Sequence, residues 1–239
     1  MELQQGIEVE KLVWFRTICL ENGLELSLEQ IELIGNYVNL LIEWNRKINL
    51  ISRKDEENVW DRHILHSIIP FFHFHLPENS VIVDVGTGGG LPGIPLKIVL
   101  PKIRLLCIDA IGKKIKAVGN MIEKLKLHDV ETIWGRAEKI ALLPEYNQKF
   151  DYVVARSVSS LVNLIEWTSQ FLKRETNKTK RSSNYSPALL IFKGGDLTAE
   201  IGEAKKKFKN VFIEERKIEV KGIATFEESV KKFLIVRNI

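Results

Sequence analysis

A glycine-rich segment, Asp84–Gly93, carries the residue pattern with the clearest chemical use in this chain. It follows the short apolar run Val81–Val85 and precedes a segment of helical periodicity. Glycines adopt a positive φ without strain and let a ligand approach the main chain closely. The pattern therefore predicts a strand, a tight turn and a helix, with a nucleoside-containing ligand in the crevice at the carboxyl end of the strand.

The glycine spacing does not by itself identify the ligand, because residues 88–93 also match the G-x-G-x-x-G dinucleotide fingerprint. Asp84 would repel a pyrophosphate, whereas it suits the ammonium and sulfonium charges of S-adenosylmethionine. Pro92 and Pro95 reduce the number of N–H groups that a helix start offers to phosphate oxygens. These features favour S-adenosylmethionine, and an NAD-binding oxidoreductase remains the alternative.

A second carboxylate, Asp109, ends the next apolar run, Arg104–Asp109. A carboxylate at this position of a nucleoside-binding fold accepts hydrogen bonds from the ribose hydroxyls of either cofactor. Ala110–Gly112 would then flank the adenine ring, and residues 135–138 would meet its edge. For Glu138, a structural place at a helix N-terminus is the alternative, because the helix macrodipole favours an acid there.

Apolar runs and helical stretches alternate from residue 80 onward, which predicts an α/β fold with a parallel sheet. The expected strands are Val81–Val85, Arg104–Asp109, Val130–Trp134, Phe150–Ala155 and Ala188–Lys193. Residues 211–220 and 231–238 have no helix between them, so they are expected to pair antiparallel at the sheet edge. The result would be the Rossmann-like seven-stranded methyltransferase sheet, parallel with an antiparallel C-terminal hairpin, rather than the six-stranded dinucleotide-binding sheet.

The residues before this sheet predict helices and no strand. Apolar residues recur at helical spacing over 7–22, and Ser27 with Gln30 forms the capping-box pattern that starts a second helix. A third helix is expected over about 55–75. The chain would thus consist of a helical N-terminal subdomain, residues 1–78, and an S-adenosylmethionine-dependent methyltransferase domain, residues 79–239.

These motifs together resemble the bacterial glucose-inhibited division protein B family, whose members methylate N7 of a guanine in small-subunit ribosomal RNA. The Leu91–Pro95 ending of the glycine turn is far more specific to this family than the glycines alone. The resemblance implies an rRNA (guanine-N7-)methyltransferase that acts on 16S ribosomal RNA. The matching segments run in order over about residues 27–195, at 44–52, 62–67, 84–95, 109–114, 135–138, 150–158 and 193–194.

The resemblance also implies cofactor contacts, which join those argued from the residues. The expected cofactor-binding set is Asp84, Gly86, Gly88, Leu91, Asp109, Ala110, Ile111, Gly112, Ala137, Glu138 and Arg156. His66 stands where the family usually has Asp, so no role of that acid transfers to this chain. The basic segment 174–187 is an insertion relative to the family, and a solvated loop and an RNA-contacting arm both fit its composition.

Methylation of guanine N7 needs no general base, because N7 exposes a lone pair. The site must hold the base in line with the S–CH3 bond. Arg156 and Lys193, at the ends of the fourth and fifth strands, are the candidate catalytic residues. Arg156 would bind the cofactor carboxylate or guanine O6, with a structural ion pair as the alternative. The chain has no Pro-Pro pair and no cysteine after those strands, which disfavours amino-group and pyrimidine carbon-5 methylation.

Polar side chains on the N-terminal helices, together with several lysines, are predicted to contact RNA. The expected set is Asn45, Arg46, Arg62, His63, Ser67, Lys113, Lys114 and Lys193. Hydrogen bonding between helices is the alternative for the N-terminal residues, and a solvated face is the alternative for Lys113 and Lys114. A methyltransferase with another acceptor and a non-catalytic RNA-binding protein also remain open.

Composition sets broad limits on compartment and partners. A net charge of +4 permits an acidic partner such as small-subunit ribosomal RNA or the small ribosomal subunit. Cys19 and Cys107 are expected to be buried thiols in a reducing compartment. The sequence shows no signal peptide and no run long enough to span a membrane, so a cytoplasmic monomer without a membrane partner is expected. His73 and His75 lack further ligands nearby, and no metal is expected.

Overall fold

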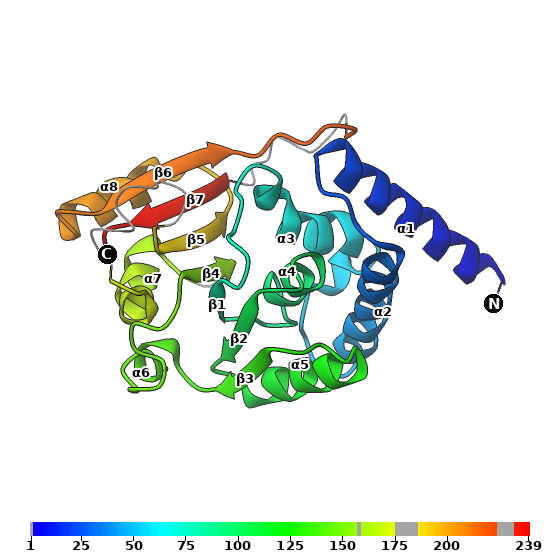
Figure 1. Ribbon diagram of the computed structural model, residues 1–239, viewed down its shortest axis with the longest axis horizontal. Helices are drawn as coiled ribbons and strands as arrows, with labels where there is room; N and C mark the ends of the chain where they lie inside the picture. Colours follow the sequence, from blue (N-terminus) through cyan, green and yellow to red (C-terminus); the bar gives the residue numbers. More distant parts are fainter. Residues whose placement is uncertain (1, 157–158, 175–185, 224–231) are drawn as a thin grey trace.

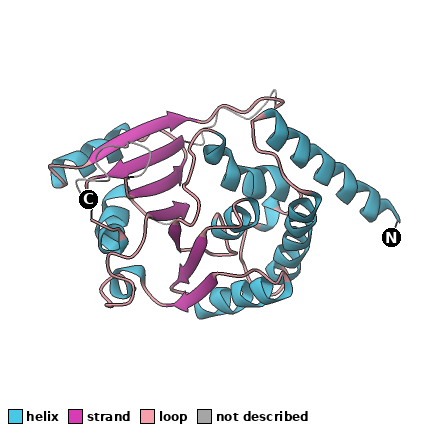
Figure 2. Cartoon of the chain, viewed as in Figure 1, coloured by secondary structure: helices cyan, strands magenta, loops and turns pink. Residues whose placement is uncertain are grey.

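The computed structural model describes the backbone of residues 2–156, 159–174, 186–223 and 232–239. It has a twisted central sheet with helices on both sides, and the N-terminal helices lie together beside the sheet (Figures 1 and 2). Most of the basic segment 174–187 lies outside the described residues, so its predicted roles are not addressed by the structure.

The sheet has the strand order β3-β2-β1-β4-β5-β7-β6, which confirms the predicted seven-stranded methyltransferase arrangement. Strands β1 to β5 pair in parallel, whereas β7 pairs antiparallel with both β5 and β6. Because β1 lies between β2 and β4, the chain changes direction across the sheet there, and a ligand crevice is expected at their carboxyl ends. The strands are β1 (Val81–Val85), β2 (Arg104–Asp109), β3 (Val130–Trp134), β4 (Tyr152–Arg156), β5 (Ala188–Lys193), β6 (Phe212–Lys217) and β7 (Lys232–Arg237).

The regular helices follow the predicted periodicity, and the capping box of Ser27 and Gln30 begins the second helix as expected. They are α1 (Glu2–Glu21), α2 (Leu28–Asn45), α3 (His66–Ile68), α4 (Gly93–Val99), α5 (Gly112–Lys124), α6 (Ala137–Ile140), α7 (Leu161–Thr168) and α8 (Thr198–Lys207). A 3-10 turn, η4 (Ser169–Phe171), extends α7.

The third predicted helix, over about 55–75, is not a single α-helix. It consists of a 3-10 turn, η1 (Arg53–Asp55), a π-helical turn, η2 (Trp60–Leu65), the short α3, and a second 3-10 turn, η3 (Ile69–Phe72). Pro70 lacks the N–H that would continue an α-helix. The apolar residues of η2, α3 and η3 are all buried, so packing rather than helical propensity sets the local backbone.

Strand side chains alternate between two cores that cover the two faces of the sheet. On one face, Ile82 and Leu105 pack with the N-terminal helices, α4 and α5. On the other face, Val83 and Leu106 pack with α6, α7 and α8. Burial on both faces explains why these strands read as continuous apolar runs.

Both cysteines are buried thiols, as predicted. Burial raises the pKa of Cys19 to about 12 and raises the pKa of Cys107 as well. These thiols therefore stay protonated at neutral pH and serve as apolar packing groups.

The N-terminal helices share one core with a face of the sheet, and buried hydrogen bonds join the two parts. The Gln30 side chain donates to the carbonyls of Ile98 and Val99 at the end of α4, at 2.8 and 3.1 Å. The fully buried Tyr37 hydroxyl donates to the Gly89 carbonyl at 2.9 Å. Helix α2 is therefore attached to the glycine turn itself, and a domain boundary near residue 78 remains a prediction.

Removing the Tyr37 hydroxyl tests how much this attachment contributes to stability. We expect Tyr37→Phe to lower the free energy of unfolding by about 1–3 kcal/mol, because the buried Gly89 carbonyl loses its partner. Tyr146→Phe is the control, since no hydrogen bond of the Tyr146 hydroxyl to the described residues is present, and it should change stability by less than about 0.5 kcal/mol. Urea denaturation of the two variants measures both values, and equal losses would show that the attachment is not specific.

Candidate functional site

The glycine turn after β1 has one partly exposed face and one packed face. Gly86, Gly88 and Gly90 have positive φ values of 70°, 59° and 94°, a conformation that residues with a Cβ rarely adopt. Gly86 and Gly88 are half-buried, whereas Gly89 is buried against α2, where a Cβ would lie 2.6 Å from Leu41 Cδ1. The glycines thus serve both a ligand approach and close packing of the N-terminal helices.

Most N–H groups of this turn are used within the protein. Those of Gly86, Thr87, Gly88, Gly90, Leu91, Gly93 and Ile94 all donate to protein carbonyls or to the carboxylates of Asp84 and Asp109. Phosphate binding at a helix start depends on free N–H groups, and the first N–H of α4, from Gly93, already binds Asp84. This turn is therefore not built to hold a pyrophosphate.

Asp84 is fully buried beneath the turn and holds its two ends together. Its Oδ2 accepts hydrogen bonds from the Thr87 hydroxyl at 2.7 Å and from the Gly93 N–H at 2.9 Å. Its Oδ1 has no hydrogen-bond partner among the described residues. Burial raises the pKa of Asp84 to about 6, although these two hydrogen bonds and the charge of Arg156 act in the opposite direction.

Asp109 lies at the carboxyl end of β2 and is buried. Its Oδ2 accepts the Gly88 N–H at 3.0 Å, and its Oδ1 accepts the Ile111 N–H at 2.8 Å. A carboxylate offers about four acceptor positions, so each oxygen retains one for a ligand hydroxyl. Asp109 thus links the glycine turn to the loop after β2 and still has hydrogen-bonding capacity.

The predicted adenine-binding segments lie next to each other at the ends of β2 and β3. Asp109 pairs with Trp134 in the sheet register, and the Gly135 N–H donates to the Asp109 carbonyl at 3.0 Å. Ala110 and Ile111 are exposed, Gly112 is half-buried, and Ala137 is buried at the start of α6. Glu138 is half-buried, and its carboxylate lies 3.9 Å from Arg136.

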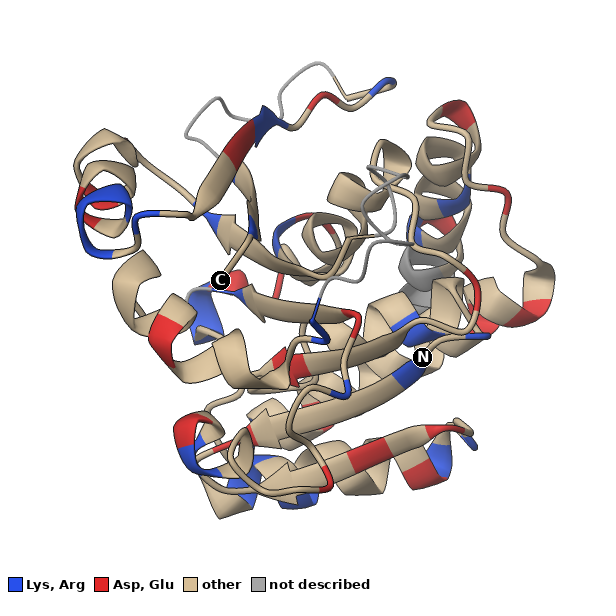
Figure 3. Ribbon diagram, turned by 60° about the vertical axis from the view of Figure 1, so that its left-hand side comes forward, with Lys and Arg blue, Asp and Glu red and all other residues tan. Residues whose placement is uncertain are grey.

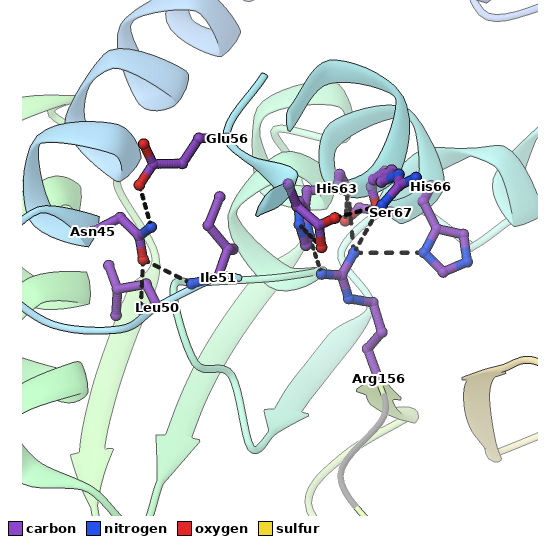
Figure 4. A network of polar contacts seen from close by, with 10 residues as sticks. Asn45, Leu50, Ile51, Glu56, His63, His66, Ser67 and Arg156 are labelled. Atoms are coloured by element: carbon purple, nitrogen blue, oxygen red, sulfur yellow. Dashed lines mark hydrogen bonds and ion pairs between the residues drawn. The ribbon is translucent and has the colours of Figure 1, made fainter. Parts of the chain in front are cut away.

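Arg156 extends from the end of β4 toward the N-terminal helices (Figure 4). Its Nη2 lies 2.5 Å from His63 Nδ1, and its Nη1 lies 3.5 Å from His66 Nδ1. A guanidinium can only donate, so His63 must accept through Nδ1 and carry its proton on Nε2. That Nε2 lies 3.4 Å from Asp55 Oδ2. Asp55, His63 and Arg156 therefore form a chain of polar contacts from η1 to β4.

Two N-terminal residues predicted to contact RNA are used inside the protein instead. Asn45 is buried, donates to Glu56 at 2.6 Å, and accepts the N–H groups of Leu50 and Ile51 (Figure 4). Ser67 is fully buried and donates to the His63 carbonyl at 2.6 Å. Because neither side chain reaches the surface, the structure does not support direct RNA contact by either, and hydrogen bonding between helical segments is their observed role.

The cationic residues predicted to contact RNA differ in exposure and in whether they form ion pairs. Lys193, at the end of β5, forms an ion pair with Glu200 of α8 at 2.5 Å and is largely buried. Arg62 is exposed but pairs with Asp55 at 2.6 Å. Arg46 and Lys113 are exposed and Lys114 is half-buried. In the view of Figure 3, Lys and Arg residues are interspersed with Asp and Glu over the described helices and loops.

Several residues at this site were not predicted from the sequence. Tyr37, Asp55 and Trp134 each contact a predicted site residue or the glycine turn. Tyr37 falls among the apolar positions of α2, where a buried side chain with one polar atom would suggest a hydrogen bond to a neighbouring segment. Nothing local in the sequence pairs Asp55 with His63, because that contact depends on the irregular backbone between them.

Among the residues that the structure describes, no group of three or more His, Cys, Asp or Glu side chains is arranged to hold a metal ion. In the same part of the chain, no helix is long and apolar enough to cross a bilayer.

The strand order, the glycine turn whose helix-start N–H binds Asp84, and the carboxylates at the ends of β1 and β2 define an S-adenosylmethionine-dependent methyltransferase. Solved structures share this fold. An S-adenosylmethionine-dependent methyltransferase from Aquifex aeolicus is 17% identical, with a TM-score of 0.51 over 78% of this chain and 97% of that one. TYW2 from M. jannaschii, solved in complex with AdoMet, is 17% identical, with a TM-score of 0.51 over 80% of this chain and 78% of that one.

The chain belongs to the ribosomal RNA small subunit methyltransferase G family, whose sequence model matches residues 30–227. Proteins named ribosomal RNA small subunit methyltransferase G are similar over most of their length. The protein from Pelodictyon phaeoclathratiforme is 34% identical over 96% of this chain and 94% of its own. That from Brevibacillus brevis is 32% identical over 93% of this chain and 88% of its own. These matches confirm the family indicated by the sequence motifs.

The raised pKa of Asp84 makes a prediction about pH. A carboxyl whose pKa rises from 3.8 to about 6 on folding stabilises the fold at acid pH, and this contribution is lost as the pH rises through about 6. Relative to Asp84→Asn, which cannot titrate, the free energy of unfolding of the wild type should fall by about 2 kcal/mol between about pH 4.5 and pH 7.5. Urea denaturation of both proteins across this range measures the difference. A difference that does not change with pH would show that the Asp84 pKa is not raised.

Proposed function

We propose that this enzyme transfers the methyl group of S-adenosylmethionine to N7 of a guanine in 16S small-subunit ribosomal RNA. The family supports the ribosomal RNA as the substrate class. The observation that supports this cofactor is the glycine turn, in which most N–H groups, including that of Gly93 at the start of α4, donate to Asp84, Asp109 or carbonyls. Such a turn suits a ligand with cationic groups and a ribose better than one with phosphates.

The residues at the ends of β1 and β2 fit S-adenosylmethionine. Asp84 Oδ1 is a buried carboxylate oxygen without a partner among the described residues, and a cationic ligand nearby would offset the cost of burying it. The remaining acceptor positions of Asp109 would bind the ribose hydroxyls. Ala110, Ile111, Gly112, Ala137 and Glu138 would surround the adenine. Gly86, Gly88 and the main chain of Leu91 would line the open side of the turn.

The acceptor would lie between the end of β4 and the N-terminal helices. S-adenosylmethionine supplies an electrophilic methyl group, so the protein has to place a guanine N7 in line with it and exclude water. The Arg156 guanidinium would bind the cofactor carboxylate or guanine O6, and its contacts to His63 and His66 would hold it in position. No group is required to remove a proton before the methyl group moves, because N7 carries a free lone pair.

The RNA footprint would use the exposed cations rather than the buried polar residues. Arg46, Arg62, Lys113 and Lys114 would contact phosphates. Lys193 would need to leave Glu200 to do so, and we assign it to holding α8 against β5. A ribosomal substrate implies a cytoplasmic enzyme, and we propose that it acts as a monomer.

A labelling experiment tests the proposal directly. The purified protein is incubated with methyl-labelled S-adenosylmethionine and either small ribosomal subunits or deproteinised 16S RNA from cells that lack the enzyme. We expect one label per RNA, which nucleoside mapping assigns to 7-methylguanosine. Label on another atom, or on a small molecule alone, would overturn the proposed acceptor.

The ribose contact is tested by Asp109→Asn. Asparagine has a single acceptor oxygen and an NH2 group that faces one of the two backbone donors, so the affinity for S-adenosylhomocysteine should fall at least about tenfold, or 1.4 kcal/mol. Asp151→Asn is the matched control, because Asp151 also accepts a backbone N–H, from Val81 at 2.8 Å, but at the other end of the sheet. Calorimetry measures both affinities, and an unchanged value for Asp109→Asn would remove Asp109 from the cofactor site.

The chain of contacts to Arg156 is tested by His63→Ala. Without the His63 ring the guanidinium keeps only its longer contacts, at 3.4–3.5 Å, so the methyl-transfer rate should fall at least about tenfold, in the direction expected of Arg156→Ala. His63→Gln, whose amide oxygen can still accept, should retain part of the rate. His128→Ala removes an exposed histidine and serves as the control. A rate equal to the wild type in His63→Ala, with Arg156→Ala impaired, would show that His63 does not position Arg156.

A further inference from the structure

Trp134, the last residue of β3, is the most exposed large apolar residue of those described, with 71% of its surface accessible. Its indole is nevertheless held in one orientation, because Nε1 donates to the Ala110 carbonyl at 3.0 Å. An exposed indole gains no stability from burial of its apolar surface. Fixing it in one orientation also costs side-chain rotamer entropy. A fixed and exposed ring is therefore a feature that a binding role would explain.

The ring lies flat over the first residue of α5. A Cβ added to Gly112 would lie 3.2 Å from both Cδ2 and Cε2 of Trp134 and 3.5 Å from Cγ, which places it above the middle of the indole. One face of the ring is thus covered by Gly112, and the exposed area belongs to the opposite face and the edges. A side chain at position 112 would force the indole to shift, so Gly112 allows the ring to pack against the start of α5.

The surroundings of the open face are cationic. Lys113 and Lys116, in the first turns of α5, are exposed, and the Arg136 side chain is 69% exposed. The positive end of the α5 dipole adds to this charge. Of the nearby acids, Asp109 is buried, and Glu138 lies 3.9 Å from Arg136 and offsets part of its charge.

The ring also lies at the cofactor end of the sheet. Trp134 pairs with Asp109 in the β2–β3 register, and its indole rests against the loop expected to flank the adenine. A substrate strand that enters the crevice from this side would pass over the open face of the indole.

We propose that the open face of Trp134 stacks on an unpaired base of the RNA substrate, while Lys113 and Arg136 contact the adjoining phosphates. Stacking of a base on an aromatic ring beside cationic side chains is how single-stranded RNA binds proteins. The flanking cations favour RNA over an apolar protein segment, which would leave these charges without partners. The inference rests on the proposed function, because it adds a contact outside the reacting centre to the same RNA-binding surface.

The experiment measures RNA affinity and cofactor affinity separately. Trp134→Ala should weaken binding to deproteinised 16S RNA at least about fivefold at fixed salt, the low end for loss of one stacked base. Trp134→Phe keeps an aromatic face and should lose less. Leu142→Ala removes another exposed apolar side chain, at 66% exposure, and should bind as the wild type does. All variants should bind S-adenosylhomocysteine within about twofold of the wild type.

Tryptophan fluorescence gives a second readout, which reports on the environment of the ring rather than on affinity. RNA binding should quench part of the wild-type tryptophan emission, and that part should be missing in Trp134→Phe. Equal RNA affinity in Trp134→Ala and Leu142→Ala, or equal quenching in wild type and Trp134→Phe, would overturn the proposal. A loss of S-adenosylhomocysteine affinity in Trp134→Ala would also overturn it and make the ring a support for the adenine loop.

The mapped methylation site separates this inference from the proposed function. If the label lies on 7-methylguanosine but Trp134→Ala binds RNA normally, only the stacking role fails. If the label lies elsewhere on the RNA while Trp134→Ala binds weakly, the stacking role stands and the assigned acceptor fails.

Discussion

The site depends on the buried Asp84 carboxylate, which accepts hydrogen bonds from the Thr87 hydroxyl and the Gly93 N–H. It joins Thr87 within the glycine turn to Gly93 at the start of α4, so one oxygen sets both the shape of the turn and the direction of the helix. The same contact removes the helix N–H that would otherwise attract a phosphate. Burying a charged carboxylate away from water costs free energy. A cationic ligand or a nearby guanidinium offsets this cost. The choice of cofactor thus follows from the way the turn is folded.

The N-terminal helices complete the site rather than stand apart from it. Tyr37 binds the back of the glycine turn, and the irregular segment after α2 brings His63 to the Arg156 guanidinium. The segment that carries His63 is a π-helical turn, a conformation that is frequent at functional sites. The N-terminal helices therefore contribute both to the packing of the glycine turn and to the position of Arg156.

Predictions from the sequence were accurate where a residue acts through its immediate neighbours. Strands β1, β2, β4, β5 and β7 were found because they are buried on both faces and read as short apolar runs. The start of α2 was found because a capping box is a local signal. The third helix was wrong because the burial of its apolar residues on several sides overrides helical periodicity. Asn45, Ser67 and Lys193 were chosen as polar residues near the site, yet each binds another group of the protein, between 4 and 11 positions away along the chain. Whether a polar side chain faces RNA or the interior is a property of packing.

The sequence alone determined the alternation of strands and helices, the glycine turn with its carboxylate, and the family, because these depend on residue types at short and regular spacings. Only the tertiary structure decided which N–H groups remain free, which cations are already paired, and which aromatic ring keeps an open face. Each of these depends on the distances between groups that lie far apart along the chain, such as the 93 positions between His63 and Arg156. A hydrogen bond requires a short donor–acceptor distance and a nearly linear geometry, so its partners are set by the packed fold and not by the residue pattern.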